Sequence, residues 1–135
     1  MPTSAADTFS TQKLEPAFRA DLAVVIGVPI GNSLTIAKGT VLGKVTSGGK
    51  YAAYNDANSN GTEVARAIAQ YDMTSDGSGN VTITNERGST VSKLAPVYVE
   101  GYFRTEDLTG LDANGAADLG YIFVGDTTTG LLHVR

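Results

Sequence analysis

The sequence predicts an all-β domain of the sandwich or barrel class, and three observations support this. Glycine occurs 16 times in 135 residues, which indicates many tight turns between short elements. Short apolar runs are separated by polar turn segments such as NDANSNG (55–61) and SDGSGN (75–80). The run VYVEGYFR (97–104) alternates as a strand does. Its odd positions, Val97 to Phe103, are expected on one face, and its even positions, Tyr98 to Arg104, on the other.

Eight strands are expected after residue 21, each bounded by Gly, Asn, Asp or Ser. They are predicted at 22–28, 33–36, 40–46, 50–54, 81–84, 96–103, 121–125 and 131–134. The length fits one domain, which we expect over residues 21–135, preceded by an N-terminal arm over residues 1–20.

The segment 61–73 fits two structures. Thr62 is a possible N-cap, and Val64, Ile68 and Tyr71 have helical spacing. The same segment also alternates as a strand would, and its alanines tilt the local prediction weakly toward helix.

Two short helical turns are predicted near the C-terminus. The first, RTEDLTGL (104–111), has Thr105 as its cap and two acids in its first turn. The second, ANGAADLG (113–120), is expected to end at Gly120.

Composition excludes several classes of function. The formal net charge is −4 and no Lys/Arg cluster is present, so binding to nucleic acid is not expected. The most apolar run, residues 22–30, is too short for a bilayer span and contains Pro29. Mostly polar residues precede it, which argues against a secretory signal. With no cysteine, disulfides and thiolate metal sites are also excluded, and we expect a soluble protein.

The first 20 residues are polar, lack periodicity and carry three isolated large apolar residues, Phe9, Leu14 and Phe18. Such a segment cannot bury enough surface to become ordered alone. It is either a frayed terminus, which composition alone favours, or an arm that becomes ordered against a partner.

The run LGKVTSGGKY (42–51) superficially resembles a phosphate-binding loop. Gly43 lies one residue too far from Gly49 and Lys50, and Tyr51 stands where a hydroxyl for magnesium is required. The segment is therefore predicted to be a β-hairpin with glycines in its loop. Val41 and Val45 are expected on one side, with Lys44 and Lys50 in solvent.

Two other patterns also fall short of a chemical site. DANSNGTE (56–63) begins like a calcium loop, but Ala67 stands where a bidentate glutamate is required, so an Asx-rich turn is predicted. The single histidine, His133, has no identifiable catalytic partner and is expected to be structural. We expect no enzyme activity, no metal and no cofactor.

Four segments in order resemble the head decoration proteins of lambda-like tailed bacteriophages. They are AKGTVLGKVTSGGKYAAYN (37–55), NGTEVARAI (60–68), PVYVEGYFRTEDLTGL (96–111) and GLLHVR (130–135). The resemblance covers about residues 34–135, whereas residues 18–33 do not match the family pattern. It also implies that 61–73 is a strand, against its local propensity.

The resemblance implies a small β-tulip or antiparallel barrel-like domain with one or two short helical turns. It further implies homotrimers on the outer surface of the expanded capsid, assembled in the host cytoplasm at three-fold and quasi-three-fold sites. There they would bind the major capsid protein and stabilise the shell against internal DNA pressure. The N-terminal arm would add a strand to the capsid, so Phe9, Leu14 and Phe18 become the candidate capsid-binding residues.

Two other functions stay open from the sequence. A β-sandwich module on a virion surface could bind glycans through Tyr51, Tyr54, Tyr98 and Tyr102, although the chain has no tryptophan for a stacking site. A small hydrolase built around His133 has the least support.

Overall fold

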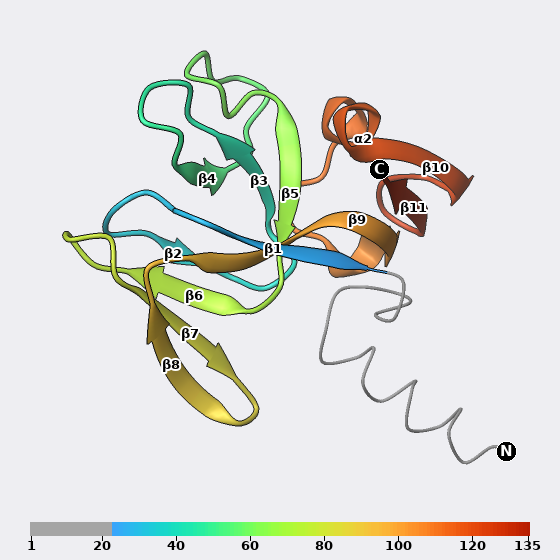
Figure 1. Ribbon diagram of the computed structural model, residues 1–135. Coiled ribbons are helices and arrows are strands. Elements are labelled where there is room, and N and C mark those ends of the chain that lie inside the picture. The colour runs from blue at the N-terminus through green and yellow to red at the C-terminus, as the bar shows by residue number, and fades with distance from the viewer. Residues whose placement is uncertain (1–22) are drawn as a thin grey trace, which may run out of the picture.

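The computed structural model describes residues 23–135 and confirms the prediction of a mainly β fold with short helical elements. Two antiparallel sheets and one α-helix make up the described fold (Figure 1). The larger sheet curls into a half-barrel. Its strands follow the order β10–β11–β9–β5–β3–β4, and β1 pairs with β9 beside this path. They are β1 (Val24–Val28), β3 (Val41–Lys44), β4 (Tyr51–Ala53), β5 (Ala65–Ala69), β9 (Ala95–Arg104), β10 (Gly120–Gly125) and β11 (Gly130–Val134).

The smaller sheet has the strand order β2–β6–β7–β8. Its strands are β2 (Thr35–Ile36), β6 (Asp72–Ser75), β7 (Val81–Asn85) and β8 (Gly88–Ser92). The sequence did not predict β6 or β8, because their Ser, Thr, Asp and Gly residues are typical of turns. Pairing with β7 over four and five residue pairs fixes both as strands.

Both predicted helical turns are present. The first is a 3-10 turn, η2 (Thr105–Asp107), but Thr105 is not its cap. Instead, Thr105 is buried, and its side-chain hydroxyl donates a hydrogen bond to the carbonyl oxygen of Asp126 at 2.9 Å. The second is α2 (Ala113–Leu119), which ends at Gly120 as predicted. Asp112 caps its start by accepting the Gly115 N–H at 2.7 Å.

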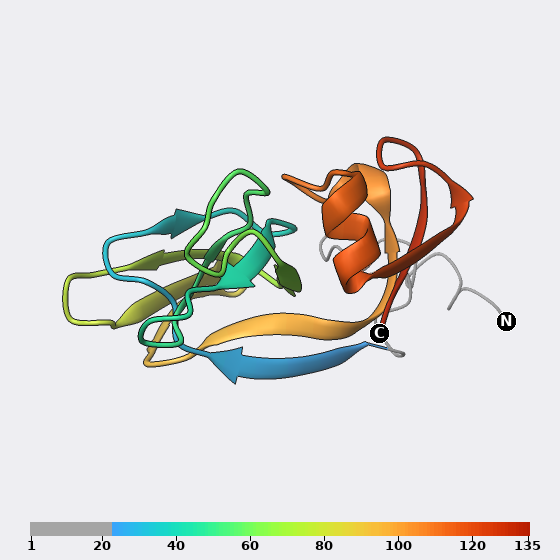
Figure 2. The same ribbon diagram turned by 90° about the horizontal axis from the view of Figure 1, so that it is seen from above.

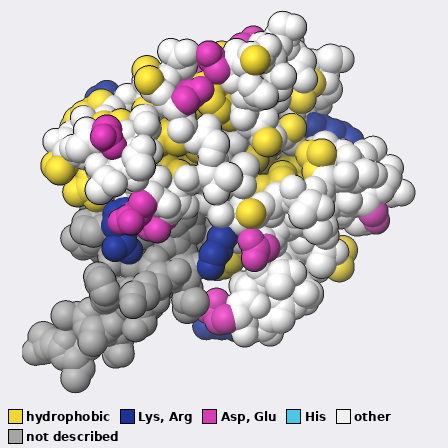
Figure 3. Space-filling view, turned by 180° about the vertical axis from the view of Figure 1, so that it is seen from behind, with side chains coloured by type: hydrophobic (Ala, Val, Ile, Leu, Met, Phe, Trp, Pro, Cys, Tyr) yellow, Lys and Arg dark blue, Asp and Glu magenta, His cyan; other side chains and the backbone are white. Residues whose placement is uncertain are grey.

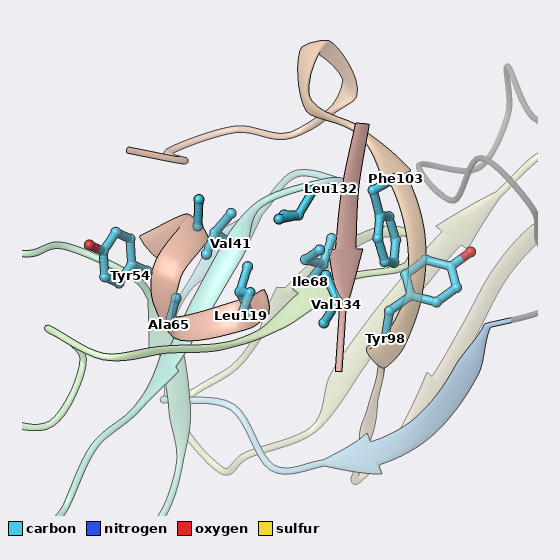
Figure 4. Close-up of a cluster of buried hydrophobic side chains, with 10 residues drawn as sticks. Val41, Tyr54, Ala65, Ile68, Tyr98, Phe103, Leu119, Leu132 and Val134 are labelled. Atoms are coloured by element: carbon cyan, nitrogen blue, oxygen red, sulfur yellow. The ribbon is translucent and has the colours of Figure 1, made fainter. Parts of the chain in front are cut away.

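The core consists of two clusters of buried apolar side chains. The first lies between α2 and the concave face of the larger sheet (Figure 4) and contains Val41, Ile68, Phe103, Leu119 and Leu132 among others. The second fills the space between the smaller sheet and the strands β1, β3, β5 and β9. Each fully buried side chain of this size contributes about 1.5–3 kcal/mol to folding. The two clusters therefore hold α2 and the smaller sheet on the larger sheet.

The expected alternation along 97–104 is wrong after Glu100. Val97 belongs to the second cluster, whereas Phe103, six residues later, belongs to the first, where it packs edge-on against Tyr98. The register of β1 on β9 shifts between Val24 and Val25, as at a β-bulge. Because a one-residue shift exchanges the two faces of a strand, Phe103 lies in the same cluster as Tyr98 and not in that of Val97.

The weak preference for helix over 61–73 is also wrong, and the strand implied by the family resemblance is correct. The segment contains β5 and the start of β6. β5 lies between β3 and β9, and Ala65, Ala67, Ile68 and Ala69 are at most 2% exposed. Small side chains fit a strand that is buried on both faces, so tertiary packing overrides the helix propensity of alanine.

The predicted hairpin over 40–54 is confirmed, with β3 paired to β4. Gly48 and Gly49 have φ of 95° and 72°, which is the left-handed conformation that favours glycine in the turn. Lys44 is exposed as expected. Lys50 is only half-exposed, because its ammonium group donates to the Asn32 side chain at 3.0 Å.

Candidate subunit- and capsid-binding surfaces

The glycine that suggested a phosphate loop has a packing role. Gly43 lies in β3 against the backbone of the neighbouring loop, and a Cβ at this position would be 2.6 Å from the Thr62 Cα and 2.9 Å from the Val64 carbonyl oxygen. Only glycine lets the two segments approach this closely. Packing between β3 and this loop therefore explains why residue 43 is glycine.

The DANSNGTE segment forms an Asx-rich turn, as predicted. Its side-chain oxygens accept hydrogen bonds from the protein itself, as in the bond of Thr62 N–H to Asn60 Oδ1. Asp56 Oδ2 accepts from the Asn114 side chain of α2 at 2.8 Å. Within residues 23–135, no group of three or more His, Asp or Glu side chains is arranged to hold a metal ion.

His133 lies in an aromatic cluster. Its ring stacks on Tyr102 at a centroid distance of 4.3 Å and an interplanar angle of 2°, and it meets Tyr121 edge-on at 5.6 Å. Phe123 contacts both tyrosines edge-on at 6.0 Å, and the Arg135 guanidinium lies 4.8 Å from the Tyr121 ring centre. This aromatic packing gives His133 a structural role.

We name this cluster, with the neighbouring Val124, the aromatic surface. It lies on β9, β10 and β11, on the side of the sheet opposite Phe103 and Leu132, which face α2 in the first cluster. Tyr121, Phe123 and Val124 are 47%, 42% and 57% exposed. Each aromatic pair of this kind contributes about 0.5–1.5 kcal/mol, so the contacts favour this arrangement of the rings.

The β10–β11 hairpin is fixed by its turn. The Asp126 carboxylate accepts the backbone N–H groups of Thr128 and Thr129 at 2.9 and 2.8 Å. These two bonds hold the pKa of Asp126 below its usual range. Sequence reasoning predicted both strands but missed the surface. The available signal was YIFV (121–124), four consecutive large apolar residues in a hairpin, which cannot all face one core.

A second exposed apolar area, the β1 surface, consists of Val24, Val25, Ile26 and Leu94. These side chains are 41–48% exposed. Leu94 belongs to the same area because its Cβ lies 3.1 Å from the position a Cβ on Gly27 would take. Within the described residues, β1 pairs with β9 only, and it lies along β9 at the border of the molecule (Figure 2). Apolar side chains on a strand with one free edge are typical of a protein-binding surface.

A shallow apolar groove of about 530 Å³ lies beside the aromatic surface. Ala113, Ala116 and Ala117 of α2 form one wall, and Tyr121 and Ile122 of β10 form the other. A hydrogen bond from the core fixes the start of α2, because the hydroxyl of the buried Tyr54 donates to Asp112 Oδ1 at 2.7 Å. Burial, together with this bond, raises the pKa of Tyr54 far above its usual value.

The four tyrosines proposed for a glycan site do not form one. Tyr54 and Tyr98 are 6% and 1% exposed and belong to the first core cluster. Tyr51 is half-buried against the second cluster, and Tyr102 is stacked on His133. The structure therefore does not support the glycan-binding alternative through these residues.

The candidate capsid-binding residues Phe9, Leu14 and Phe18 lie outside the described residues.

Acidic and basic side chains are interspersed over the rear face, without a continuous basic area (Figure 3). Within the described part of the chain, no helix is both long enough and apolar enough to cross a membrane.

Comparison with models of known protein families gives a match over most of the chain. The sequence model of the family of bacteriophage lambda head decoration protein D matches residues 22–119. Comparisons with curated proteins and with solved structures gave no match. The matched residues hold nine of the eleven described strands and α2. The chain therefore belongs to the family of bacteriophage lambda head decoration protein D, a structural family of the phage head that decorates the capsid.

Proposed function

We propose that this chain binds the outer surface of the expanded phage head as a homotrimer at three-fold and quasi-three-fold sites. There it binds neighbouring copies of the major capsid protein and stabilises the shell against internal DNA pressure. The role is structural and involves no catalysis. The observation that carries the proposal is the family match over residues 22–119.

Two physical features support this role. The described residues leave nine large hydrophobic side chains 37–66% exposed, which suits a protein that associates with other chains. The chain has no cysteine, so neither its folding nor its association depends on disulfides. Assembly in the reducing host cytoplasm is consistent with this composition.

We further propose that residues 1–20 form the arm that binds the capsid. Phe9, Leu14 and Phe18 would provide apolar anchors, and main-chain hydrogen bonds to a capsid strand would provide much of the affinity. The described fold begins at Ala23, directly before β1. Because β1 is anchored on β9, the point at which the described fold begins is fixed.

Deletion of residues 2–17 tests the arm. We expect the truncated chain to keep the circular-dichroism spectrum and melting temperature of the full chain but to lose binding to expanded, undecorated heads in co-sedimentation. The substitutions Phe9→Ser, Leu14→Ser and Phe18→Ser together should have the same effect at full length. The matched control is Thr3→Ser, Thr8→Ser and Thr11→Ser, which leaves all three anchors in place. Equal binding by the truncated and full-length chains would show that the arm is not required.

A further inference from the structure

The dipeptide Asn-Gly occurs twice in the chain, at Asn60–Gly61 and at Asn114–Gly115. In this dipeptide the glycine nitrogen can close a five-membered ring on the side-chain carbonyl carbon of the asparagine, because glycine has no Cβ to obstruct the approach. Ring closure releases ammonia and leaves a succinimide, which water opens to aspartate or isoaspartate. The structure places the two dipeptides in different surroundings, and the surroundings of Asn60 favour this reaction.

Asn60 and Gly61 lie in the loop before β5, where a carboxylate contacts the glycine nitrogen. Glu63 Oε1 accepts the Gly61 N–H at 2.7 Å. This distance is within the range over which a general base takes a proton. A backbone N–H is a poor nucleophile until its proton is removed, so the Glu63 carboxylate activates the nitrogen that closes the ring.

The side-chain oxygen of Asn60 accepts two further hydrogen bonds, both from Thr62. The backbone N–H donates at 3.1 Å and the hydroxyl at 2.6 Å. Negative charge develops on this oxygen when its carbon is attacked, so two positioned donors stabilise the intermediate as an oxyanion hole does. Thr62 is 1% exposed, and its hydroxyl accepts from the Asn58 side chain at 2.8 Å, which directs the hydroxyl proton toward Asn60. Asn60 itself is exposed, so ammonia can leave and water can enter.

From these contacts we propose that Asn60 is a self-modification site, where the folded chain promotes its own deamidation. The Gly61 nitrogen forms a bond to the Asn60 side-chain carbonyl carbon while Glu63 takes the amide proton. The bond from that carbon to the side-chain nitrogen then breaks, and the nitrogen leaves as ammonia with the proton that Glu63 returns. One water molecule opens the succinimide at either of its carbonyl groups, so the overall reaction consumes only water.

Asn114 is held in a different way. It lies in the first turn of α2, and its side-chain nitrogen donates to Asp56 Oδ2 at 2.8 Å. The Gly115 N–H also donates to a carboxylate, that of Asp112, at 2.7 Å. Ring closure here, however, requires the first turn to leave its helical conformation. It would break the bonds that Asp112 accepts from the N–H groups of Gly115 and Ala116. We therefore expect Asn114 to stay an amide while the chain is folded.

Conversion of Asn60 changes the contact between its loop and the β3–β4 hairpin. The Asn60 carbonyl oxygen accepts the Thr46 N–H at 2.8 Å. A Cβ on Gly61 would lie 2.3 Å from the Lys44 carbonyl oxygen, so the loop and the hairpin are in close contact. Isoaspartate adds one atom to the main chain at this point, and either product adds one negative charge to the net charge of −4. The converted chain should therefore melt at a lower temperature.

Peptide mapping by mass spectrometry, after incubation of the full-length chain at neutral pH, follows both dipeptides in the same molecules. We expect Asn60 to convert at least about tenfold faster than Asn114 in the folded chain. In concentrated urea at the same pH the two rates should be similar. Glu63→Gln should slow Asn60 by about tenfold or more without changing Asn114. In the matched control, Glu86→Gln removes the same charge from the exposed turn between β7 and β8 and should leave both rates unchanged.

The unsubstituted chain alone is sufficient to overturn the proposal. Promotion by the fold requires Asn60 to convert faster in the folded chain than in urea, and a slower rate in the folded chain would contradict it. Equal rates for Asn60 and Asn114 in the folded chain would contradict it as well. A folded Glu63→Gln variant that converts as fast as the unsubstituted chain would exclude Glu63 as the base. Asn114 also reports unfolding, because a substitution that unfolds the chain brings both rates to their values in urea.

Discussion

Substituting Gly43 by alanine tests whether close packing explains the glycine in LGKVTSGGKY. The added Cβ would meet three backbone atoms, the nearest being the Thr62 Cα at 2.6 Å. Ordinary contacts between carbon atoms are about 3.5–4.0 Å. β3 and the loop must therefore separate by about 1 Å, and backbone atoms cannot move aside as a flexible side chain can.

The loop that must move is itself tightly held. Thr62 is 1% exposed, and its hydroxyl donates to Asn60 Oδ1 at 2.6 Å and accepts from the Asn58 side chain at 2.8 Å. Overpacking of this kind costs about 1–3 kcal/mol, and weakening a buried hydrogen-bond network adds to the cost. We expect Gly43→Ala to lower the free energy of unfolding by about 2–3 kcal/mol and the melting temperature by roughly 6–15 °C.

Urea denaturation followed by circular dichroism measures this difference. The matched control is Gly77→Ala, because a Cβ at Gly77 would meet no atom within 4 Å and its φ is not in the left-handed region. The control should stay within about 0.5 kcal/mol of the unsubstituted chain. If Gly43→Ala is as stable as Gly77→Ala, the packing explanation for this glycine is wrong.

Three further substitutions test the core and α2. Leu132→Ala should lower the free energy of unfolding, measured by urea denaturation, by about 2–5 kcal/mol, because Leu132 is fully buried. An equally large loss for Leu94→Ala, whose side chain is 48% exposed, would contradict the core assignment. Asp118→Ala should lower the free energy of unfolding by about 1–3 kcal/mol, because the Asp118 carboxylate accepts the backbone N–H of Ala65, at the start of β5, at 2.9 Å. Amide hydrogen exchange at Ala65 should become faster. An unchanged exchange rate there would count against this hydrogen bond. Asp112→Asn should lower stability mainly above about pH 4, because the Gly115 N–H holds the pKa of the Asp112 carboxyl below its usual range. That stabilisation is lost as the pH falls through the lowered pKa, so the two stability curves should converge toward pH 2, and a constant gap would refute the reasoning.

Local signals were sufficient for several elements. The hairpin of β3 and β4 was predicted because glycines follow an apolar run, and its turn has the expected positive φ angles. The end of α2 was predicted from Gly120. In each case the residues that determine the structure are close together in the sequence, so no tertiary information was needed.

Other features depend on contacts between distant residues. β9 changes its buried face near Gly101, which has φ of 149°, and the change follows from its pairing with β1 and β11. β5 is a strand because β3 and β9 flank it, not because alanine favours strands. The two apolar surfaces were missed for the same reason, since hydrophobicity marks a residue for burial without telling whether its own chain or another one buries it.

The central claim is that this chain decorates the phage head, and binding of the purified full-length chain to expanded, undecorated heads tests it most directly. Co-sedimentation over a range of concentrations gives the bound copy number. We predict saturable binding in groups of three per three-fold or quasi-three-fold site, with no binding to heads that already carry the protein. A chain that stays in the supernatant at every concentration, while folded by circular dichroism, would contradict the claim.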